Sequence, residues 1–449
     1  MVSSTWLLVA TPAGVLMAIG CLIGAFRTLR KKRLIDDNPT SKTQGVFIGL
    51  VELKGTAEME NPLVSYLAGI QCVQYAYKVQ EHWSRTVVET YSDGKGHMHT
   101  RTRTESGWKT VADGTEMSPF YLKDDTGIVR IVPEGAKIEG KEIFDKTVGR
   151  DDPLYFGKCP AGEIANSTHR RRFQENAIPL HAELYIVGQA RERTDVVAAE
   201  IAKDKSAPMF IISTRTERQV SSGFNAGVWG WAISSLVLAI GVAAAWQYLD
   251  TPTAIWLPYV IAAGGFIIAY MTGWIWTIYN SFINLHNRVG QGWSQVEVQL
   301  KRRNDLIPNL VQTVEGYRTH EKETQTLIAG MRNQLTATAP GVAGPDFNGV
   351  APLLKAVVEN YPDLKASGQF LQLQKSLVET EQRIALARDY YNQIATFYNS
   401  RLEMVPDRFI GALARLRPRT LMTATDFERA PVTVKLGDRD TRATKSSGL

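Results

Sequence analysis

Two long stretches in the C-terminal half of the chain repeat apolar residues at alternating spacings of four and three. Polar Arg303 alone interrupts the first row, which is Val289, Trp293, Val296, Leu300, Ile307, Leu310, Val314 and Tyr317. The second row is Phe370, Leu373, Leu377, Ile384, Tyr391, Ile394 and Tyr398. This spacing predicts helices that pack lengthwise, as in a coiled coil. A helix from about Tyr279 to Leu335 would be about 80 Å long, so we expect a helical rod.

Three apolar runs are each long enough to cross a bilayer. They lie at residues 5–27, 228–249 and 254–276, and tryptophans and tyrosines gather at the ends of the last two. A basic cluster, Arg27–Arg33, follows the first run, and basic residues also flank the other two. Positive charge stays on the cytoplasmic side. The pattern therefore predicts an integral membrane protein with its N-terminus outside and both soluble regions in the cytoplasm.

Residues 44–219 lie between the first and second apolar runs and read as a compact, β-rich (α+β) domain. Short segments carry β-branched and aromatic residues between turn signals, which is typical of strands. Examples are residues 72–79, 126–133, 182–190 and 208–214. The sequence Ser-Asp-Gly-Lys-Gly at 92–96 marks a hairpin turn or an open loop.

The net charge of +6 over 449 residues does not by itself indicate nucleic acid. Much of the basic excess lies beside apolar runs or in the tail, so membrane-flanking charge is the simpler explanation, and no nucleic-acid partner is expected. The three cysteines, Cys21, Cys72 and Cys159, form no CxxC pair. That spacing excludes a zinc ribbon, a RING or a disulfide framework.

The sequence offers no catalytic constellation, no cofactor and no metal site, since it lacks a phosphate-binding glycine pattern and a nucleophile with a nearby base. The basic run Arg170, Arg171 and Arg172 could contact an acidic lipid headgroup, and a solvated basic face is the plainer alternative.

Polar residues and one proline lie on or near the predicted helical seams. The candidate packing and assembly residues are Trp293, Arg303, Asp305, Pro308, Glu321, Glu381, Arg388, Asn392 and Asn399. Buried polar pairs fix register and partner choice in packed helices. We expect Arg303 to pair with Glu381, and Pro308 to kink its helix near Asn304. A catalytic role for these residues is the weaker alternative.

The first seam begins in YNSFINLHNRVGQGWSQVEVQLKRRNDLIPNLVQTVEGYRTHE, and the second lies in ENYPDLKASGQFLQLQKSLVETEQRIALARDYYNQIATFYNSRLEMVP. Both resemble the LemA family signature, from about Trp276 to Pro418. The resemblance implies a membrane-anchored bundle of long helices at residues 277–418, without known catalytic chemistry. LemA-bearing chains are mostly bacterial, which implies a bacterial inner membrane. Residues 419–449 are expected to be extended or disordered.

A second resemblance covers the β-rich region. The segments GLVELKGTAEMENPLVSYLAGIQCVQYAYKV, PFYLKDDTGIVRIVPEGAKI, LHAELYIVGQA and PMFIISTRTE occur in the order typical of the GIDE domain, the membrane domain of the mitochondrial ubiquitin ligase MULAN. They span about Leu50 to Arg218. In those ligases a C-terminal RING recruits the charged ubiquitin carrier. A LemA-like segment stands in its place here, so the resemblance carries no chemical basis for ligase activity.

Together these patterns predict a multi-domain membrane protein with three transmembrane helices, a β-rich GIDE-like domain and a LemA-like helical bundle. We expect a non-enzymatic scaffold that forms homo-oligomers, or docks a partner protein, through its helices at the lipid bilayer. The alternatives are a RING-less relative of membrane E3 ubiquitin transferases and a membrane module that senses a lipid or another signal.

Overall fold

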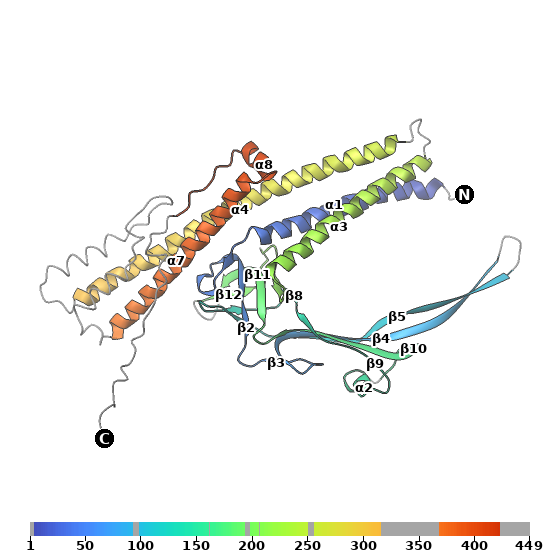
Figure 1. Ribbon diagram of the computed structural model, residues 1–449, viewed down its shortest axis with the longest axis horizontal. Helices are drawn as coiled ribbons and strands as arrows, with labels where there is room; N and C mark the ends of the chain where they lie inside the picture. The colour runs from blue at the N-terminus through green and yellow to red at the C-terminus, as the bar shows by residue number, and fades with distance from the viewer. Residues whose placement is uncertain are drawn as a thin grey trace, which may run out of the picture. The chain divides into compact units, whose positions relative to one another are not determined.

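Figure 1 shows a computed structural model of the chain. It describes residues 4–92, 98–160, 162–193, 198–205, 207–249, 256–315 and 368–422. The chain forms two compact units. The first contains residues 1–288 and 397–417, and the second contains residues 289–396 and 418–449. Each is described by itself.

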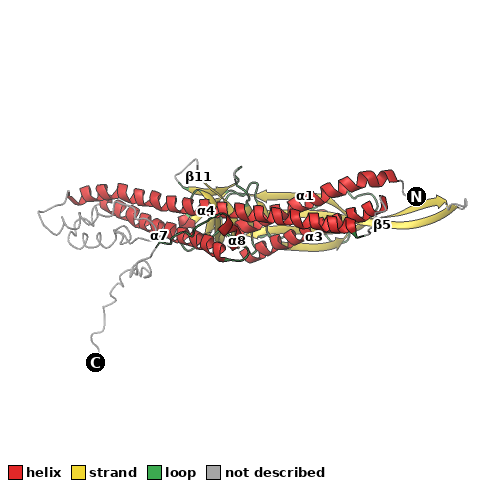
Figure 2. Cartoon of the chain, turned by 90° about the horizontal axis from the view of Figure 1, so that it is seen from above, coloured by secondary structure: helices red, strands yellow, loops and turns green. Residues whose placement is uncertain are grey.

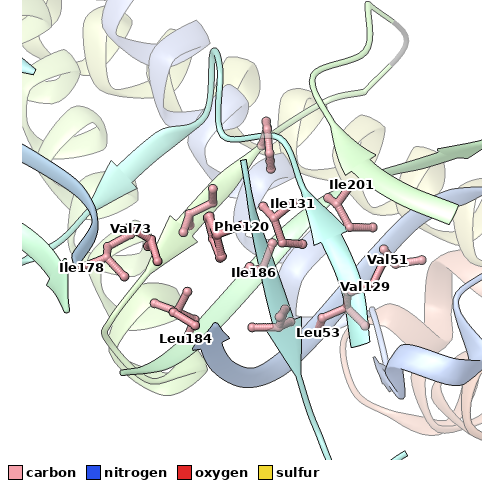
Figure 3. Packing of buried hydrophobic residues seen from close by; sticks show 14 of the residues in the cluster. Val51, Leu53, Val73, Phe120, Val129, Ile131, Ile178, Leu184, Ile186 and Ile201 are labelled. Atoms are coloured by element: carbon pink, nitrogen blue, oxygen red, sulfur yellow. The ribbon is translucent and has the colours of Figure 1, made fainter. Parts of the chain in front are cut away.

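An eight-stranded sheet forms the centre of the first unit, in the order β1-β2-β6-β7-β12-β11-β13-β8. Its strands are β1 (Thr40–Ser41), β2 (Gly49–Glu58), β6 (Phe120–Lys123), β7 (Ile128–Ile131), β8 (Lys137–Glu139), β11 (Glu183–Glu192), β12 (Ala199–Ala202) and β13 (Ile211–Ser213), and the short 3-10 helix η1 (Thr43–Gly45) follows β1. Strand β2 also pairs with β11, which closes β2, β6, β7, β12 and β11 into a ring. Leu53, Phe120, Ile131 and Ile186 are fully buried inside it (Figure 3).

A second sheet has the order β3-β4-β10-β9, with β5 paired to β4. Its strands are β3 (Leu63–Val64), β4 (Gln71–Ser92), β5 (Met98–Met117), β9 (Lys141–Gly149) and β10 (Ser167–Pro179), and the short helix α2 is Leu154–Gly157. Strand β10 accompanies β4 only as far as Trp83, whereas β5 continues to Ser92. Beyond Trp83 the two strands therefore form a two-stranded ribbon (Figure 1).

In the part of the chain that the structure describes, three helices are long and apolar enough to cross a membrane. They are α1 (Ser4–Asp36), α3 (Glu217–Leu249) and α4 (Leu257–Glu315), and they contain the described parts of the three apolar runs. Helix α1 packs along α3, where the Ser235 hydroxyl donates to the Ala18 carbonyl at 2.8 Å. The end of α1 and the start of α3 meet the sheet in one buried cluster of Ile35, Tyr185, Val187, Met209, Ile211 and Val220.

Helix α4 runs without a break for 59 residues (Figure 2). The apolar run at residues 254–276 and the helix expected from about Tyr279 are therefore parts of one helix where the structure describes them. Nothing between Trp276 and Val289 stops a helix, because the segment contains no proline or glycine. The described part of α4 ends at Glu315, and the rest of the expected helix to Leu335 lies outside the described residues.

The second unit contains the C-terminal part of α4 and most of α7 (Gly368–Glu403). Helix α7 covers the second long helix expected from the sequence. Its last turns and the short α8 (Asp407–Leu413) belong to the first unit. Apolar seam positions in the second unit are buried on both helices: Val289, Val296, Leu300 and Ile307 on α4, and Phe370, Leu377, Ile384, Tyr391 and Ile394 on α7.

Candidate functional site

Arg303 lies in the middle of the seam, where it is fully buried. Its Nη1 lies 3.5 Å from Oε1 of Glu381 on α7, whose side chain is 21% exposed. The pair expected from the sequence is therefore present, as an ion pair longer than a short charged hydrogen bond. A guanidinium taken out of water without a carboxylate would cost several kcal/mol, on the order of the penalty known for unpaired buried ions. The pair therefore favours one alignment of α4 against α7.

The other candidate residues lie at different places along α4 and α7. The rings of Trp293 and Tyr391 meet edge to face, with centroids 6.0 Å apart. Arg388 is buried, whereas Asp305 and Pro308 are exposed on α4. Asn399, at the end of α7, belongs to the first unit and is half-buried. Glu321 lies outside the described residues.

Asn392 holds the chain segment that follows α8. Its Nδ2 donates to the Met422 carbonyl at 3.0 Å, and its Oδ1 accepts from the Met422 amide at 2.7 Å. The neighbouring Tyr391 hydroxyl donates to the Thr420 carbonyl at 2.9 Å. Hydrogen bonds from Tyr391 and Asn392 thus hold residues 420–422 along α7 and satisfy backbone polar groups of Thr420 and Met422. These hydrogen bonds give a local structural reason for an asparagine beside the seam.

A second set of charges lies in the first unit, where helices from distant parts of the chain meet. We call Arg33, Asp37, Arg401 and Asp407 the ionic cluster. Arg401 contacts both acids, at 2.6 Å from Asp37 and at 2.6 Å from Asp407. Arg33 lies 3.2 Å from Asp407, and the Ser281 hydroxyl of α4 donates to Asp37 at 2.9 Å. The cluster thus connects α1, α4, α7 and α8.

Both acids of the ionic cluster are only 5% exposed. Burial raises the pKa of Asp37, and the nearby Arg401 guanidinium opposes that rise. Burial alone would lower the pKa of Arg401, but Asp37 and Asp407 outweigh it and raise that pKa. Each charge is therefore held by its neighbours, and removing one leaves another buried charge without its full set of partners.

The three arginines at residues 170–172 lie on strand β10 and differ in how far their side chains are buried. Arg171 is fully buried, with Nε and Nη2 at 3.0 and 2.9 Å from Oε2 of Glu81. It also donates to the Tyr155 and Gly162 carbonyls at 2.7 Å. A headgroup cannot reach it, and that part of the expectation is corrected. Arg172 pairs with Asp145, Nε to Oδ1 at 3.1 Å, and Arg170 is exposed.

No group of three or more histidine, cysteine, aspartate or glutamate residues that could hold a metal occurs in the described part of the chain. Burial raises the pKa of the Cys72 thiol to about 11. A thiol is nucleophilic only when it is deprotonated, so Cys72 acts as a buried apolar residue.

Two family models match separate regions of the chain. Residues 292–436 match the model of the LemA family. Residues 88–245 match the GIDE model, described as E3 ubiquitin ligase, and this match begins later than the start near Leu50 expected from the sequence. Protein LemA of Metamycoplasma hominis is 26% identical over 158 residues, which are 34% of this chain and 72% of that protein.

Magnetosome proteins are also similar to this chain. MamQ 2 of Paramagnetospirillum magneticum is 26% identical over 163 residues, which are 30% of this chain and 60% of that protein. MamQ of Magnetospirillum gryphiswaldense is 24% identical over 165 residues, which are 30% of this chain and 61% of that protein. The similarity thus spans less than two thirds of each MamQ protein. The chain therefore combines a LemA-family region at residues 292–436 with a GIDE region at residues 88–245.

Proposed function

We propose that this chain is a membrane-anchored, non-catalytic scaffold that self-assembles, or docks a partner protein, through its LemA-family helices. The observation that carries the proposal is the continuity of α4. One helix contains an apolar segment suited to a bilayer and, farther along, the seam with its Arg303–Glu381 pair. The similarity to LemA and MamQ proteins supports membrane association without catalysis.

The same helices keep apolar side chains at their surface. In the second unit Val298 of α4 and Leu371 and Val378 of α7 are 57%, 50% and 43% exposed. Apolar residues on the outside of a packed helix pair suit contacts with helices of further copies. Homo-oligomerisation is therefore the favoured form of the scaffold.

The proposed location is a bacterial inner membrane. Basic residues follow the apolar part of α1, precede that of α3 at Arg215 and Arg218, and follow that of α4. All three groups would lie in the cytoplasm under the positive-inside rule. The N-terminus would then be outside, with the β-rich domain and the LemA-family region inside. Labelling of single engineered cysteines from either side of the membrane tests this orientation.

Mass photometry and negative-stain imaging of the full-length protein in detergent test the scaffold. We expect closed particles of several copies. Val298→Asp with Leu371→Asp should shift them to smaller species, whereas the exposed polar control Glu297→Gln should not. A monomeric wild-type protein would refute self-assembly and direct attention to a partner protein.

One observation favours a second function. The match of residues 88–245 to a model described as E3 ubiquitin ligase supports a ubiquitin-transferase-like role. Incubating the purified full-length protein with a ubiquitin-charged carrier enzyme tests it. Accelerated discharge of the carrier would establish the transferase and contradict a purely structural role.

A further inference from the structure

A cavity of about 570 Å³ lies between α1 and α4 in the first unit. One part of its wall is apolar and is formed by Ile23, Phe26 and Trp276. The other part is polar and strongly basic, with Arg27, Arg30, Arg33 and Arg288. Asp37 is the single carboxylate among the lining residues that the structure describes, so the cavity as a whole is positively charged.

The four arginines are not equivalent. Arg33 is paired with Asp407. Nη1 of Arg288 donates to the side-chain oxygen Oδ1 of Asn38 at 3.0 Å. Arg27 and Arg30 are exposed, and neither has a hydrogen bond or an ion pair with any residue that the structure describes. Two guanidinium groups one helical turn apart therefore face the cavity with their donors available.

The cavity lies where both helices change from apolar to polar sequence. On α1 the uncharged run ends at Phe26 and charge begins at Arg27. On α4 the apolar run ends at Trp276, which is 71% exposed. A Cβ added at Gly273 would meet the Phe26 ring. Glycine at this position thus permits close approach of the two helices beside Phe26.

We propose that this cavity binds the phosphate of an anionic phospholipid. Guanidinium groups bind phosphate oxygens through paired, charge-assisted hydrogen bonds. Arg27 and Arg30 supply those donors, and Arg288 lies on the opposite wall. Ile23, Phe26 and Trp276 contact the acyl chains next to the glycerol. An apolar wall directly beside the basic one distinguishes this cavity from a site for a free, fully hydrated anion.

The inference rests on the proposed membrane anchoring and names a ligand for the anchor. Arg33 and Asp37 line the cavity and also belong to the ionic cluster. A phosphate bound beside them adds negative charge next to Arg33, so lipid binding stabilises the junction of α1 and α4. The readout is therefore thermal stability as well as lipid retention.

The test uses full-length protein purified in detergent. Phosphatidylglycerol, phosphatidylcholine and inorganic phosphate are added separately, and the Tm and the lipid adducts seen by native mass spectrometry are measured. We expect phosphatidylglycerol to raise the Tm and to be retained, and the other two to have little effect. Equal protection by phosphatidylcholine would overturn the anion site, and equal protection by inorganic phosphate would overturn the lipid assignment.

Two variants of equal charge make the test specific. Arg27→Gln with Arg30→Gln should weaken phosphatidylglycerol binding by about a hundredfold or more, the loss of roughly two charge-assisted hydrogen bonds. Lys31→Gln with Arg218→Gln removes the same charge from exposed positions that do not line the cavity, and should bind as the wild type does. Equal binding by both variants would overturn the proposal.

Carbonate extraction of membranes is measured on the same proteins, because it separates the two proposals. A wild-type chain released by carbonate would refute the membrane anchor itself. A chain that stays in the membrane but does not select phosphatidylglycerol would refute the lipid site alone.

Discussion

Replacing Glu381 by alanine should destabilise the packed helices, because Arg303 would remain buried without its carboxylate. Arg303 is fully buried, whereas Glu381 is 21% exposed and lies 3.5 Å away. Breaking a fully buried ion pair by removing one partner costs about 3–5 kcal/mol. The partial exposure of Glu381 and the long contact place this case near the lower end, at about 2–3 kcal/mol.

The double variant Arg303→Met with Glu381→Leu separates the cost of removing one member of the pair from the contribution of the whole pair. Apolar residues of similar size can replace a buried ion pair with little loss or with a gain. We therefore expect the double variant to be more stable than Glu381→Ala. The difference between them measures the cost of keeping the guanidinium buried after the Glu381 carboxylate has been removed.

Denaturant unfolding of the full-length protein in detergent, followed by circular dichroism, is the assay. The control Glu379→Ala removes an exposed acid from the same helix, where it pairs with Arg383 at 2.8 Å, and should cost less than about 1 kcal/mol. An unfolding curve of Glu381→Ala equal to that of the wild type would refute the assignment of Arg303 as a charge that depends on this partner.

Three further predictions concern the first unit. Asp37→Ala removes one of the two carboxylates that contact Arg401 and should lower stability by about 2–4 kcal/mol in thermal unfolding. The control Asp36→Ala changes the neighbouring, more exposed acid and should cost under about 1 kcal/mol in the same assay. Arg171→Met should destabilise by about 3 kcal/mol or more and Arg172→Met by under about 1 kcal/mol; equal losses would contradict their different burial. Burial raises the pKa of Glu52 to about 7, against hydrogen bonds from Thr40 and Tyr185, so the folded state binds the proton more tightly than the unfolded chain does. Stability should therefore fall by about 3 kcal/mol in total as the pH rises from about 4.5 to about 7, and Glu52→Gln should remove that slope in unfolding curves measured across this range.

The sequence predicted those parts of the structure that depend on local periodicity. Alternating spacings of three and four identified the seam, and the same pattern identified Arg303 as the polar residue inside it, since a helix places positions three and four apart on one face. Glu381 was expected as its partner because it is an acid on or near the facing stripe, and the structure places the two 3.5 Å apart. By contrast, the continuity of α4 was not stated from the sequence, because a change from apolar to amphipathic sequence does not end a helix when no residue interrupts its backbone hydrogen bonds.

The ionic cluster and the β4–β5 ribbon were not predicted, for two different reasons. The acid–base contacts of the cluster join Asp37 to Arg401 and Arg33 to Asp407, residues 364 and 374 positions apart, and no local pattern encodes such pairs. In the ribbon both faces carry polar residues, as in Thr100–Thr104. The alternation of apolar and polar residues that usually identifies a strand is therefore missing. Register likewise decided that Arg171 points inward and Arg172 outward.

Arginine in the first unit serves two purposes that a lysine could not serve equally. Arg401 is held by two carboxylates, whereas Arg27 and Arg30 line the cavity at the end of an apolar run. Arg27→Lys with Arg30→Lys keeps the positive charge that sets the membrane topology. It replaces two planar guanidinium groups, each able to form paired hydrogen bonds, by compact ammonium groups. We therefore expect unchanged cysteine labelling from both sides of the membrane, together with weaker retention of phosphatidylglycerol. Retention equal to that of the wild type would mean that charge alone holds the lipid, and the proposed paired hydrogen bonds would be wrong.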